Sequence, residues 1–262
     1  MCITCGCTPE EPDDHVHDHD GREHSHPAHD HDHPHGHDHH LHKDGRRTVI
    51  AIEEDILAKN NRLAAFNRAL FKDKGIFVLN LVSSPGSGKT TLLERTLRDL
   101  SGKFRFSVIE GDQQTDNDAR RIAATGVAVR QINTGAGCHL DAHQVMHGTE
   151  GFDLDNLDIL MIENVGNLVC PASFDLGEHH KVAVLSVTEG EDKPLKYPQM
   201  FHNSTVMLLN KTDLLPHLDF DVEKCKGYAR RVNPAIVIFE VSARSGEGME
   251  AWYRWLGEGA AR

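Results

Sequence analysis

Residues 83–90 of this 262-residue chain read Ser83-Ser84-Pro85-Gly86-Ser87-Gly88-Lys89-Thr90, and they lie between a short apolar run and the start of a helical pattern. The spacing is that of a P-loop, except that Ser83 stands where the first glycine of the pattern is usual. In such a loop the backbone amides cradle phosphates, the lysine reaches the β and γ phosphates, and the threonine hydroxyl binds Mg²⁺. The stretch therefore predicts a nucleotide site. Its candidate residues are Gly86, Ser87, Gly88, Lys89, Thr90 and Thr91.

Short apolar runs rich in Val and Ile alternate with helical patterns on both sides of this loop. The runs cover residues 76–82, 106–110, 127–132, 159–163, 182–187, 206–210 and 236–241. Runs that are apolar along nearly their whole length are typical of parallel strands buried on both faces. We therefore expect an α/β fold of the P-loop NTPase type, with a mostly parallel seven-stranded sheet and helices on both faces. Ligands of such folds bind beyond the carboxyl ends of the strands, where the motifs of this chain are found.

A second motif, Asn210-Lys211-Thr212-Asp213, follows the sixth run, and Ser242-Ala243-Arg244 follows the last one. An aspartate carboxylate can accept the two N–H groups that guanine presents and adenine lacks, and the asparagine amide can reach acceptors on the base. The motif comes about 120 residues after the P-loop, and together they predict GTP rather than ATP as the substrate. The base-binding candidates are Asn210, Lys211, Asp213, Ser242 and Ala243.

Two carboxylates, Asp112 and Glu163, stand at or just beyond the ends of strand runs. Glu163-Asn164-Val165-Gly166 occupies the place where small GTPases carry Asp-x-x-Gly, the element that senses the γ-phosphate and holds Mg²⁺ through water. We expect Asp112 and Glu163 to act with Lys89 in catalysis, either at Mg²⁺ or by orienting the attacking water. The alternative is that both are solvated acids at strand ends.

The N-terminal segment has a composition of its own. Residues 1–44 hold thirteen of the twenty histidines and eleven acids against two basic residues, which gives −9 of the chain's net charge of −12. A segment with almost no large apolar side chains cannot offset the entropy of ordering, so we predict that residues 1–44 are disordered without metal. Residues 45–262 are the predicted GTPase domain, which begins with an amphipathic helix at 49–72 on its outside.

Three thiols, those of Cys2, Cys5 and Cys7, lie within six residues of this segment. Soft thiolates suit zinc, copper(I) or nickel, and the three are close enough to share one ion. The histidine tract at residues 15–42 could hold several divalent ions weakly, and its composition does not choose nickel over zinc. We interpret the segment as a metal-binding tail.

A second group of candidate metal ligands lies inside the predicted domain. Cys138 and His139 follow a glycine-rich turn at a predicted helix start, where the local field would favour a thiolate. Cys170 comes seven residues after Glu163, and it would join the same ion if the chain folds back toward Cys138. A ligand tethered so close to a γ-phosphate sensor would move on hydrolysis, so hydrolysis could change metal affinity. Cys225 has no such neighbours, and we expect it to be structural.

Other classes of partner are disfavoured by the charge and hydropathy of the chain. The 218 residues after the tail carry a net charge near −3, which gives no basic surface for nucleic acid or anionic lipid. No apolar run is long enough to span a bilayer, and the N-terminus does not have the layout of a secretory signal. We therefore expect a cytoplasmic protein with reduced cysteines and neither a membrane nor a nucleic-acid partner.

Together these elements resemble the HypB family of hydrogenase maturation GTPases, from about residue 48 to the C-terminus. The stretches that carry the resemblance are residues 53–61, 83–90, 111–112 with 118–119, 137–142, 163–171 and 210–213. The resemblance implies a dimerising P-loop GTPase with slow intrinsic turnover, whose homodimer is favoured by GTP and metal. It also implies that Cys138, His139 and Cys170 of both subunits meet around Ni²⁺ or Zn²⁺. The implied partners are a HypA-like zinc-containing maturation protein and the large subunit of a nickel-iron hydrogenase.

Two alternatives to a nickel donor for hydrogenase remain. Urease-maturation GTPases also carry a histidine-rich tail and a P-loop, but they typically place Cys-Pro-His in the middle of the domain, where this chain has Cys170-Pro171-Ala172. A nickel storage protein would need no working G domain, and the intact Lys89, Thr90 and Asp213 argue against that alternative.

Overall fold

The computed structural model describes residues 43–135 and 137–261. Residues 1–42 of the predicted metal-binding tail, with Cys2, Cys5, Cys7 and the histidine tract, lie outside the described residues, and so does their predicted disorder. Lys43 and Asp44, the last two residues of the predicted tail, are helical instead, because the first helix begins at Lys43. In the part of the chain that is described, the strands form one seven-stranded sheet in the order β3-β2-β4-β1-β5-β6-β7. The strands are β1 (Phe77–Ser83), β2 (Phe106–Asp112), β3 (Ala128–Asn133), β4 (Ile159–Glu163), β5 (His180–Ser186), β6 (Val206–Asn210) and β7 (Val237–Glu240).

Every pair of neighbouring strands in this sheet is parallel. The prediction of a mostly parallel α/β sheet is thus confirmed, and its strand ends differ from the predicted runs by two residues at most. All residues of β1, β4 and β6 are buried, as expected for strands covered on both faces. The carboxyl ends of the strands therefore share one edge, which is where the predicted site residues gather.

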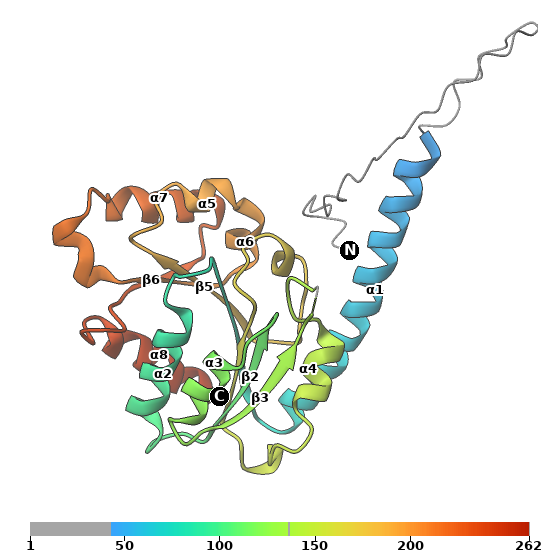
Figure 1. Ribbon diagram of the computed structural model, residues 1–262, viewed down its shortest axis with the longest axis horizontal. Helices are drawn as coiled ribbons and strands as arrows, with labels where there is room; N and C mark the ends of the chain where they lie inside the picture. The colour runs from blue at the N-terminus through green and yellow to red at the C-terminus, as the bar shows by residue number, and fades with distance from the viewer. Residues whose placement is uncertain (1–42, 136, 262) are drawn as a thin grey trace, which may run out of the picture.

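Helices cover both faces of the sheet (Figure 1). They are α1 (Lys43–Asp73), α2 (Lys89–Leu100), α3 (Asn117–Ala123), α4 (Ala142–Gly148), α5 (Lys193–Lys196), α6 (Pro198–Asn203), α7 (Val222–Val232) and α8 (Met249–Ala260), with short 3-10 turns at Leu154–Asn156, Cys170–Ala172 and Thr212–His217. On one face, α2, α3 and α8 enclose a core with the alternate residues Phe77, Leu79 and Leu81 of β1. The opposite residues of the sheet pack against α1 and α4 at one end and α6 and α7 at the other.

Helix α1 begins at Lys43, six residues before the predicted start, and ends at Asp73. With 31 residues it is about 46 Å long, and Figure 1 shows its first turns extending past the body of the molecule. Its C-terminal half is the packed half, with Ala64 and Phe71 fully buried. The predicted helix on the outside of the domain is therefore found, and it contributes to the core near α4.

Among the described residues, no helix is both long enough and apolar enough to cross a bilayer.

Candidate functional site

The P-loop connects β1 to α2 at the carboxyl edge of the sheet. Gly86 and Gly88 have φ angles of +76° and +90°, which glycine adopts without strain. A Cβ on Gly88 would also lie 2.7 Å from Asn210 Nδ2, so this position needs glycine for space as well. The loop leads directly into the N-terminus of α2 at Lys89, and helix N-termini are places where backbone amides can bind anions. These features explain why the sequence folds here into the tight turn that the P-loop motif predicts.

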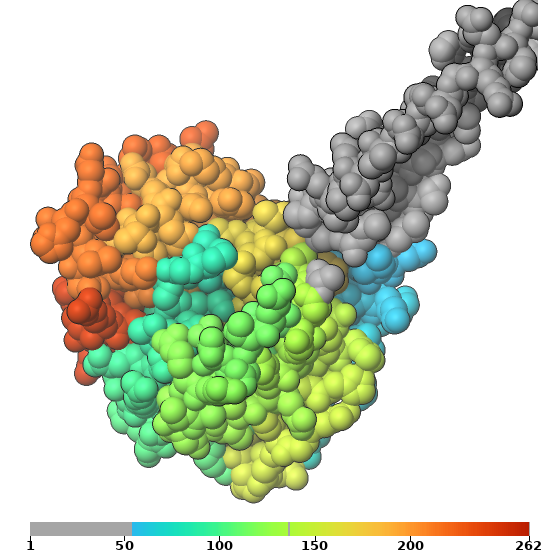
Figure 2. All heavy atoms as spheres, viewed as in Figure 1, coloured from blue at the N-terminus to red at the C-terminus, as the bar shows by residue number. Residues whose placement is uncertain are grey.

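An open cleft of about 590 Å³ lies over this loop. It is lined by residues 83–91 together with Asp112, Gln113, Asp118, Arg121, Val165, Gly166 and Lys211. In the space-filling view, teal atoms of the α2 segment reach the surface between the orange segment that contains α5 and the green segment that contains α3 (Figure 2). The cleft therefore brings most of the predicted nucleotide residues to one opening.

Lys89, Thr90 and Glu163 are in direct contact at the floor of the cleft. Lys89 Nζ donates to Glu163 Oε1 at 2.9 Å and also to the main-chain oxygen of Asn164. Thr90 Oγ1 lies 2.6 Å from the same Glu163 oxygen and 3.0 Å from Asp118 Oδ2. The side chain of Glu163 is only 1% exposed, so its ion pair with Lys89 is a buried one. Asp118, to which the motifs gave no chemical role, is the residue that the structure adds here.

Glu110 is a further carboxylate at this floor. It lies opposite Glu163 in the register of β2 and β4, and it is 3% exposed. Burial raises the pKa of Glu110 to about 8, and the charge of Glu163 adds to the effect. Near neutral pH, Glu110 therefore keeps its proton while Glu163 pairs with Lys89. One signal in the sequence could have found this residue, because Glu110 ends an apolar run just before Gly111-Asp112.

Asp112 lies on the rim of the same cleft and shapes the loop after β2. Its Oδ1 accepts from Gln113 N at 2.6 Å, and its Oδ2 accepts from Thr115 Oγ1 at 2.7 Å. Burial opposes ionisation of this carboxyl, but the hydrogen bonds from Thr115 and Gln113 outweigh it and lower the pKa of Asp112. Asp112 therefore faces the cleft as a charged acceptor, separate from the cluster around Lys89.

The structure joins the two predicted base-binding segments to the P-loop. Asn210, at the end of β6, donates from Nδ2 to Ser87 O at 3.1 Å and accepts at Oδ1 from Ala243 N at 3.1 Å. Lys211 has a φ of +63°, and its Nζ donates to Gly86 O at 2.7 Å. Ser242 Oγ donates to Asp213 Oδ1 at 2.6 Å, which orients this carboxylate. The five candidates therefore lie beside the phosphate loop.

The three predicted metal ligands of the domain also meet. The ligand atoms of Cys138, His139 and Cys170 all lie within 4.8 Å of one another, and Cys138 Sγ is 3.5 Å from His139 Nδ1. Ligands at about 2.0–2.3 Å from a shared ion need only small movements from such positions. Burial lowers the pKa of His139, and the neutral imidazole is the form that binds metal. Its ring packs against Phe174, with centroids 4.0 Å apart.

The predicted helix start beside Cys138 is wrong. Helix α4 begins at Ala142, where Asp141 accepts from Gln144 N and the Gln144 side chain accepts from Asp141 N. This capping box fixes the helix start beyond Leu140, so Cys138 lies in the preceding loop. The helix N-terminus therefore does not explain the chemistry of the Cys138 thiol. Cys225 is fully buried, and burial raises its pKa to about 12, in keeping with the expected structural role.

Asn164 lies between the predicted nucleotide cleft and the candidate metal ligands. Its main-chain oxygen accepts from Lys89, and its Oδ1 accepts from Leu140 N at 3.0 Å, next to His139. The side chain is 1% exposed and is also held by Asn80, whose Oδ1 accepts from Asn164 Nδ2 at 3.2 Å. One buried residue thus contacts the P-loop lysine and the segment that carries two of the candidate ligands.

Known proteins share both the sequence and the fold of this chain. The family model for the CobW/HypB/UreG nucleotide-binding domain matches residues 77–240. The hydrogenase maturation factor HypB of Azotobacter vinelandii is 67% identical over 208 residues, which cover 79% of this chain and 69% of that protein. HypB of Escherichia coli K12 is 64% identical over 211 residues, covering 80% and 73%. A hydrogenase/urease maturation factor HypB of Helicobacter pylori is 42% identical over 215 residues, covering 79% and 86%.

A solved structure of a HypB protein is also similar to this chain in fold. The crystal structure of HypB from Helicobacter pylori in complex with nickel superposes with a TM-score of 0.74 at 40% identity, and the match covers 78% of this chain and 95% of that one.

Proposed function

Because the chain belongs to the HypB family of hydrogenase maturation factors, we propose that it is a GTP-hydrolysing nickel chaperone that delivers Ni²⁺ to a nickel-iron hydrogenase. The observation that carries the proposal is the link through Asn164. This residue joins Lys89 of the P-loop to the segment that holds Cys138 and His139. A nucleotide that changes the partners of Lys89 would act through this link on a metal-binding cluster.

In this proposal the P-loop amides and Lys89 bind the β and γ phosphates of GTP. Phosphate oxygens would replace Glu163 and the Asn164 carbonyl as the partners of Lys89, because they carry more charge. At the other end, Asp213 accepts from the guanine N–H groups, and Ser242 holds it in place. Asn210 keeps the base and phosphate segments at a fixed separation.

The donor set beside Thr90 fits Mg²⁺. Thr90, Asp118 and Glu163 supply hard oxygen ligands, and Glu163 Oε2 is buried with no hydrogen-bond partner among the described residues. Bound there, Mg²⁺ would offset the charge that builds up between the β and γ phosphates. Asp112, on the rim, and Glu163 are the candidates for orienting the water that attacks the γ-phosphorus to give GDP and phosphate.

Nickel is the cargo of this cycle. Cys138, His139 and Cys170 would hold it between rounds, and Zn²⁺ is the competing ion for the same thiolate and imidazole donors. When Lys89 returns from phosphate to Glu163, the segment from Glu163 to Cys170 changes its position, and the ion is released.

The remaining parts of the proposal concern partners. Two thiolates and one imidazole leave room for ligands from a second copy, so we propose a homodimer that is favoured by GTP and metal. A HypA-like zinc protein and the hydrogenase large subunit are the proposed recipients. The cysteine triplet and the histidine tract of residues 1–44 would collect nickel for this domain, and such thiol chemistry belongs to the reducing cytoplasm.

A nickel titration tests the proposal directly. The full chain with Cys2, Cys5 and Cys7 changed to Ser, here named the tail-serine variant, has thiols only at Cys138, Cys170 and Cys225. Its thiolate-to-nickel charge-transfer absorption therefore reports on the domain site. We expect the nickel affinity to differ about 5- to 150-fold between a GTP analogue and GDP, and Cys138→Ala to remove the absorption. Identical titrations with the two nucleotides would contradict nucleotide-gated delivery.

Urease maturation is the second candidate, because one relative of this chain is named a hydrogenase/urease maturation factor. The sequence Cys170-Pro171-Ala172, without the histidine of the urease-type motif, favours hydrogenase. Loss of hydrogenase activity with normal urease activity in a host that makes both enzymes and has this gene deleted would support the first candidate. Loss of urease alone would support the second.

A further inference from the structure

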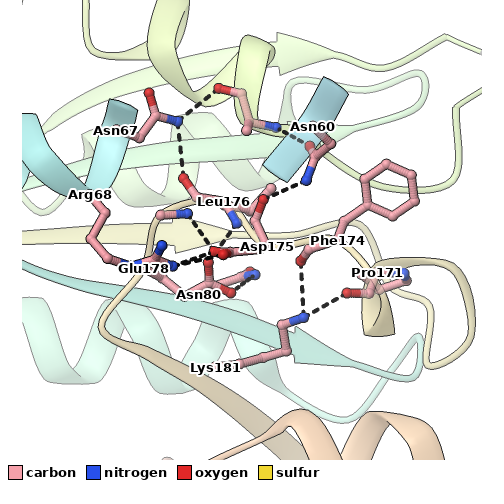
Figure 3. Close-up of polar contacts among 12 residues, drawn as sticks. Asn60, Asn67, Arg68, Asn80, Pro171, Phe174, Asp175, Leu176, Glu178 and Lys181 are labelled. Carbon is pink, nitrogen blue, oxygen red and sulfur yellow. Dashed lines mark hydrogen bonds and ion pairs between the residues drawn. The ribbon is translucent and has the colours of Figure 1, made fainter. Parts of the chain in front are cut away.

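The three candidate metal ligands come from two separate segments of the chain. Cys138 and His139 lie in the connection from β3 to α4, and Cys170 lies in the connection from β4 to β5. Neither connection is part of the sheet at its ligand positions, so the site needs a third element to hold the two segments at ligand distance. Helix α1 is that element, since the packed half of α1 contacts both (Figure 3).

Asn60 of α1 uses the two ends of its amide on the two segments. Its Nδ2 donates to Asp175 O at 2.8 Å, five residues after Cys170, and its Oδ1 accepts from Ala142 N at 2.9 Å, three residues after His139. The side chain is 5% exposed, so these hydrogen bonds are shielded from water. One amide therefore fixes the separation between the two connections.

Asn67 repeats this arrangement two helical turns later, on the same face of α1. Its Nδ2 donates to Ala142 O at 2.8 Å and to Leu176 O at 3.0 Å, and the residue is fully buried. Next to it, Arg68 forms an ion pair with Asp175, in which Nη2 donates to Oδ1 at 2.6 Å and to Oδ2 at 2.8 Å. Helix α1 therefore hydrogen-bonds to both connections at two positions along its length, Asn60 and Asn67.

The second segment is shaped to fit this helix. Gly177 has a φ of +91°, and a Cβ there would lie 2.7 Å from Ala64 O and 2.7 Å from Asn67 Cβ. From the other side, Lys181 Nζ donates to the carbonyls of Pro171, Ala172 and Phe174 at 2.9, 3.0 and 3.0 Å. The turn that carries Cys170 is therefore held between a buried lysine and α1.

We propose that α1 is a positioning element of the metal site, with Asn60 and Asn67 as the positioning residues that set the distance between Cys170 and the Cys138-His139 pair. This inference rests on the proposed metal site. The cysteine- and histidine-rich segment directly precedes α1 in the sequence, so it is covalently joined to the helix that shapes the domain site. Groups that orient metal ligands without touching the ion typically contribute about 10- to 100-fold to metal affinity.

The test uses the tail-serine variant and nickel(II), with thiolate-to-nickel charge transfer as the readout. Asn60→Ala and Asn67→Ala are expected to weaken nickel binding about 10- to 100-fold and to change the charge-transfer band, because the thiolates no longer hold their separation. Gly177→Ala should shift the band in the same way. The matched control is Asn233→Ala, which removes an amide that bridges the carbonyls of Phe201, His202 and Ser204 on another part of the fold.

The inference would be overturned if Asn60→Ala and Asn67→Ala both had the same nickel affinity and the same charge-transfer band as the control Asn233→Ala. Cys138→Ser and Cys170→Ser separate this failure from failure of the proposed function. If these two variants keep the band, the metal site itself is wrong, and the inference falls with it. If a buried asparagine variant does not fold, Arg68→Ala, which removes an exposed ion pair to the same segment, is expected to weaken nickel binding in the same direction by a smaller factor.

Discussion

At the residue scale, the floor of the cleft holds two carboxylates in different charge states. Glu163 on β4 pairs with Lys89. Glu110, opposite it on β2, keeps its proton up to about pH 8, because burial and the charge of Glu163 disfavour ionisation. A proton retained on Glu110 avoids a second buried negative charge beside the one that binds Lys89. Glu110 therefore helps to keep this pocket intact at neutral pH.

Glu110→Gln tests this charge state through stability. The folded protein binds this proton more tightly than the unfolded chain, whose glutamates have an ordinary pKa of 4.5, so the wild-type free energy of unfolding falls as pH rises from about 4.5 through about 8. Each pKa unit corresponds to about 1.4 kcal/mol, and the variant should lose less stability over this window. Denaturant titrations at several pH values measure the effect, with the exposed Glu250→Gln as control. Parallel curves for wild type and Glu110→Gln would contradict it.

Motifs predicted the residues whose role is local. Lys89 and Thr90 belong to a loop with a fixed spacing, and Asn210 follows a strand with a recognisable tetrapeptide. The protonation of Glu110 depends on its register against Glu163, and Asp118 reaches Thr90 from another helix. Register and helix packing are not visible in the spacing of residues along one chain, so neither role could be predicted.

At the scale of elements, the connection after β4 is the segment through which, in the proposed function, the state of the nucleotide would reach the metal ligands. Its first residue, Asn164, touches Lys89 with its carbonyl and Leu140 with its side chain. The parallel sheet makes this possible, because β1, β2 and β4 end side by side. The nucleotide and metal segments are therefore neighbours at one edge.

Asn164→Ala separates these two contacts. The variant keeps the carbonyl that Lys89 uses and loses the hydrogen bond to Leu140, so GTP analogue and GDP should still bind. We expect the ratio of nickel affinities in the two nucleotide states to fall at least about fivefold toward one. Nickel titration of the tail-serine variant with and without this change measures it, and Cys225→Ala, at a buried thiol away from the site, is the control. An unchanged ratio would show that the coupling takes another route.

The elements themselves were largely readable from apolar patterns. Strand runs are apolar on both faces, and they were placed within two residues of the strands that form. Helix α4 begins at Ala142, later than the predicted start beside Cys138, because Asp141 and Gln144 form a capping box that sets the first helical residue. Helix α1 starts at Lys43, before the apolar pattern that predicted it, because such a pattern marks only the part of a helix that has an apolar face. Lys43, Arg46 and Arg47 have good helix propensity, and the helix continues through them although Gly45 disfavours it.

At the scale of the whole molecule, the described residues contain the sheet, the cleft and the domain metal ligands. Removal of residues 1–42 should therefore leave GTP hydrolysis within about twofold of the full chain, because every residue that lines the described cleft is retained and changes elsewhere usually have small effects. The number of nickel ions bound per chain should fall sharply, because the histidines and the cysteine triplet are removed. Phosphate release and equilibrium dialysis against nickel measure the two effects, and loss of hydrolysis in this truncation would show that tail and domain do not act independently.

The hydrogen bonds of Asn210 to Ser87 and Ala243 have a consequence for the timing of the cycle. They join the predicted base-binding segments and the P-loop into one unit, so in the proposed cycle GDP would keep nearly all the contacts of GTP and lose only those to the γ-phosphate. The product would then be slow to leave, and the protein would spend most of each round with GDP bound. The interval between two deliveries would be set by the rate of nucleotide exchange. A protein that separates the base-binding segments from the P-loop would then speed up GDP release and control the rate of nickel supply.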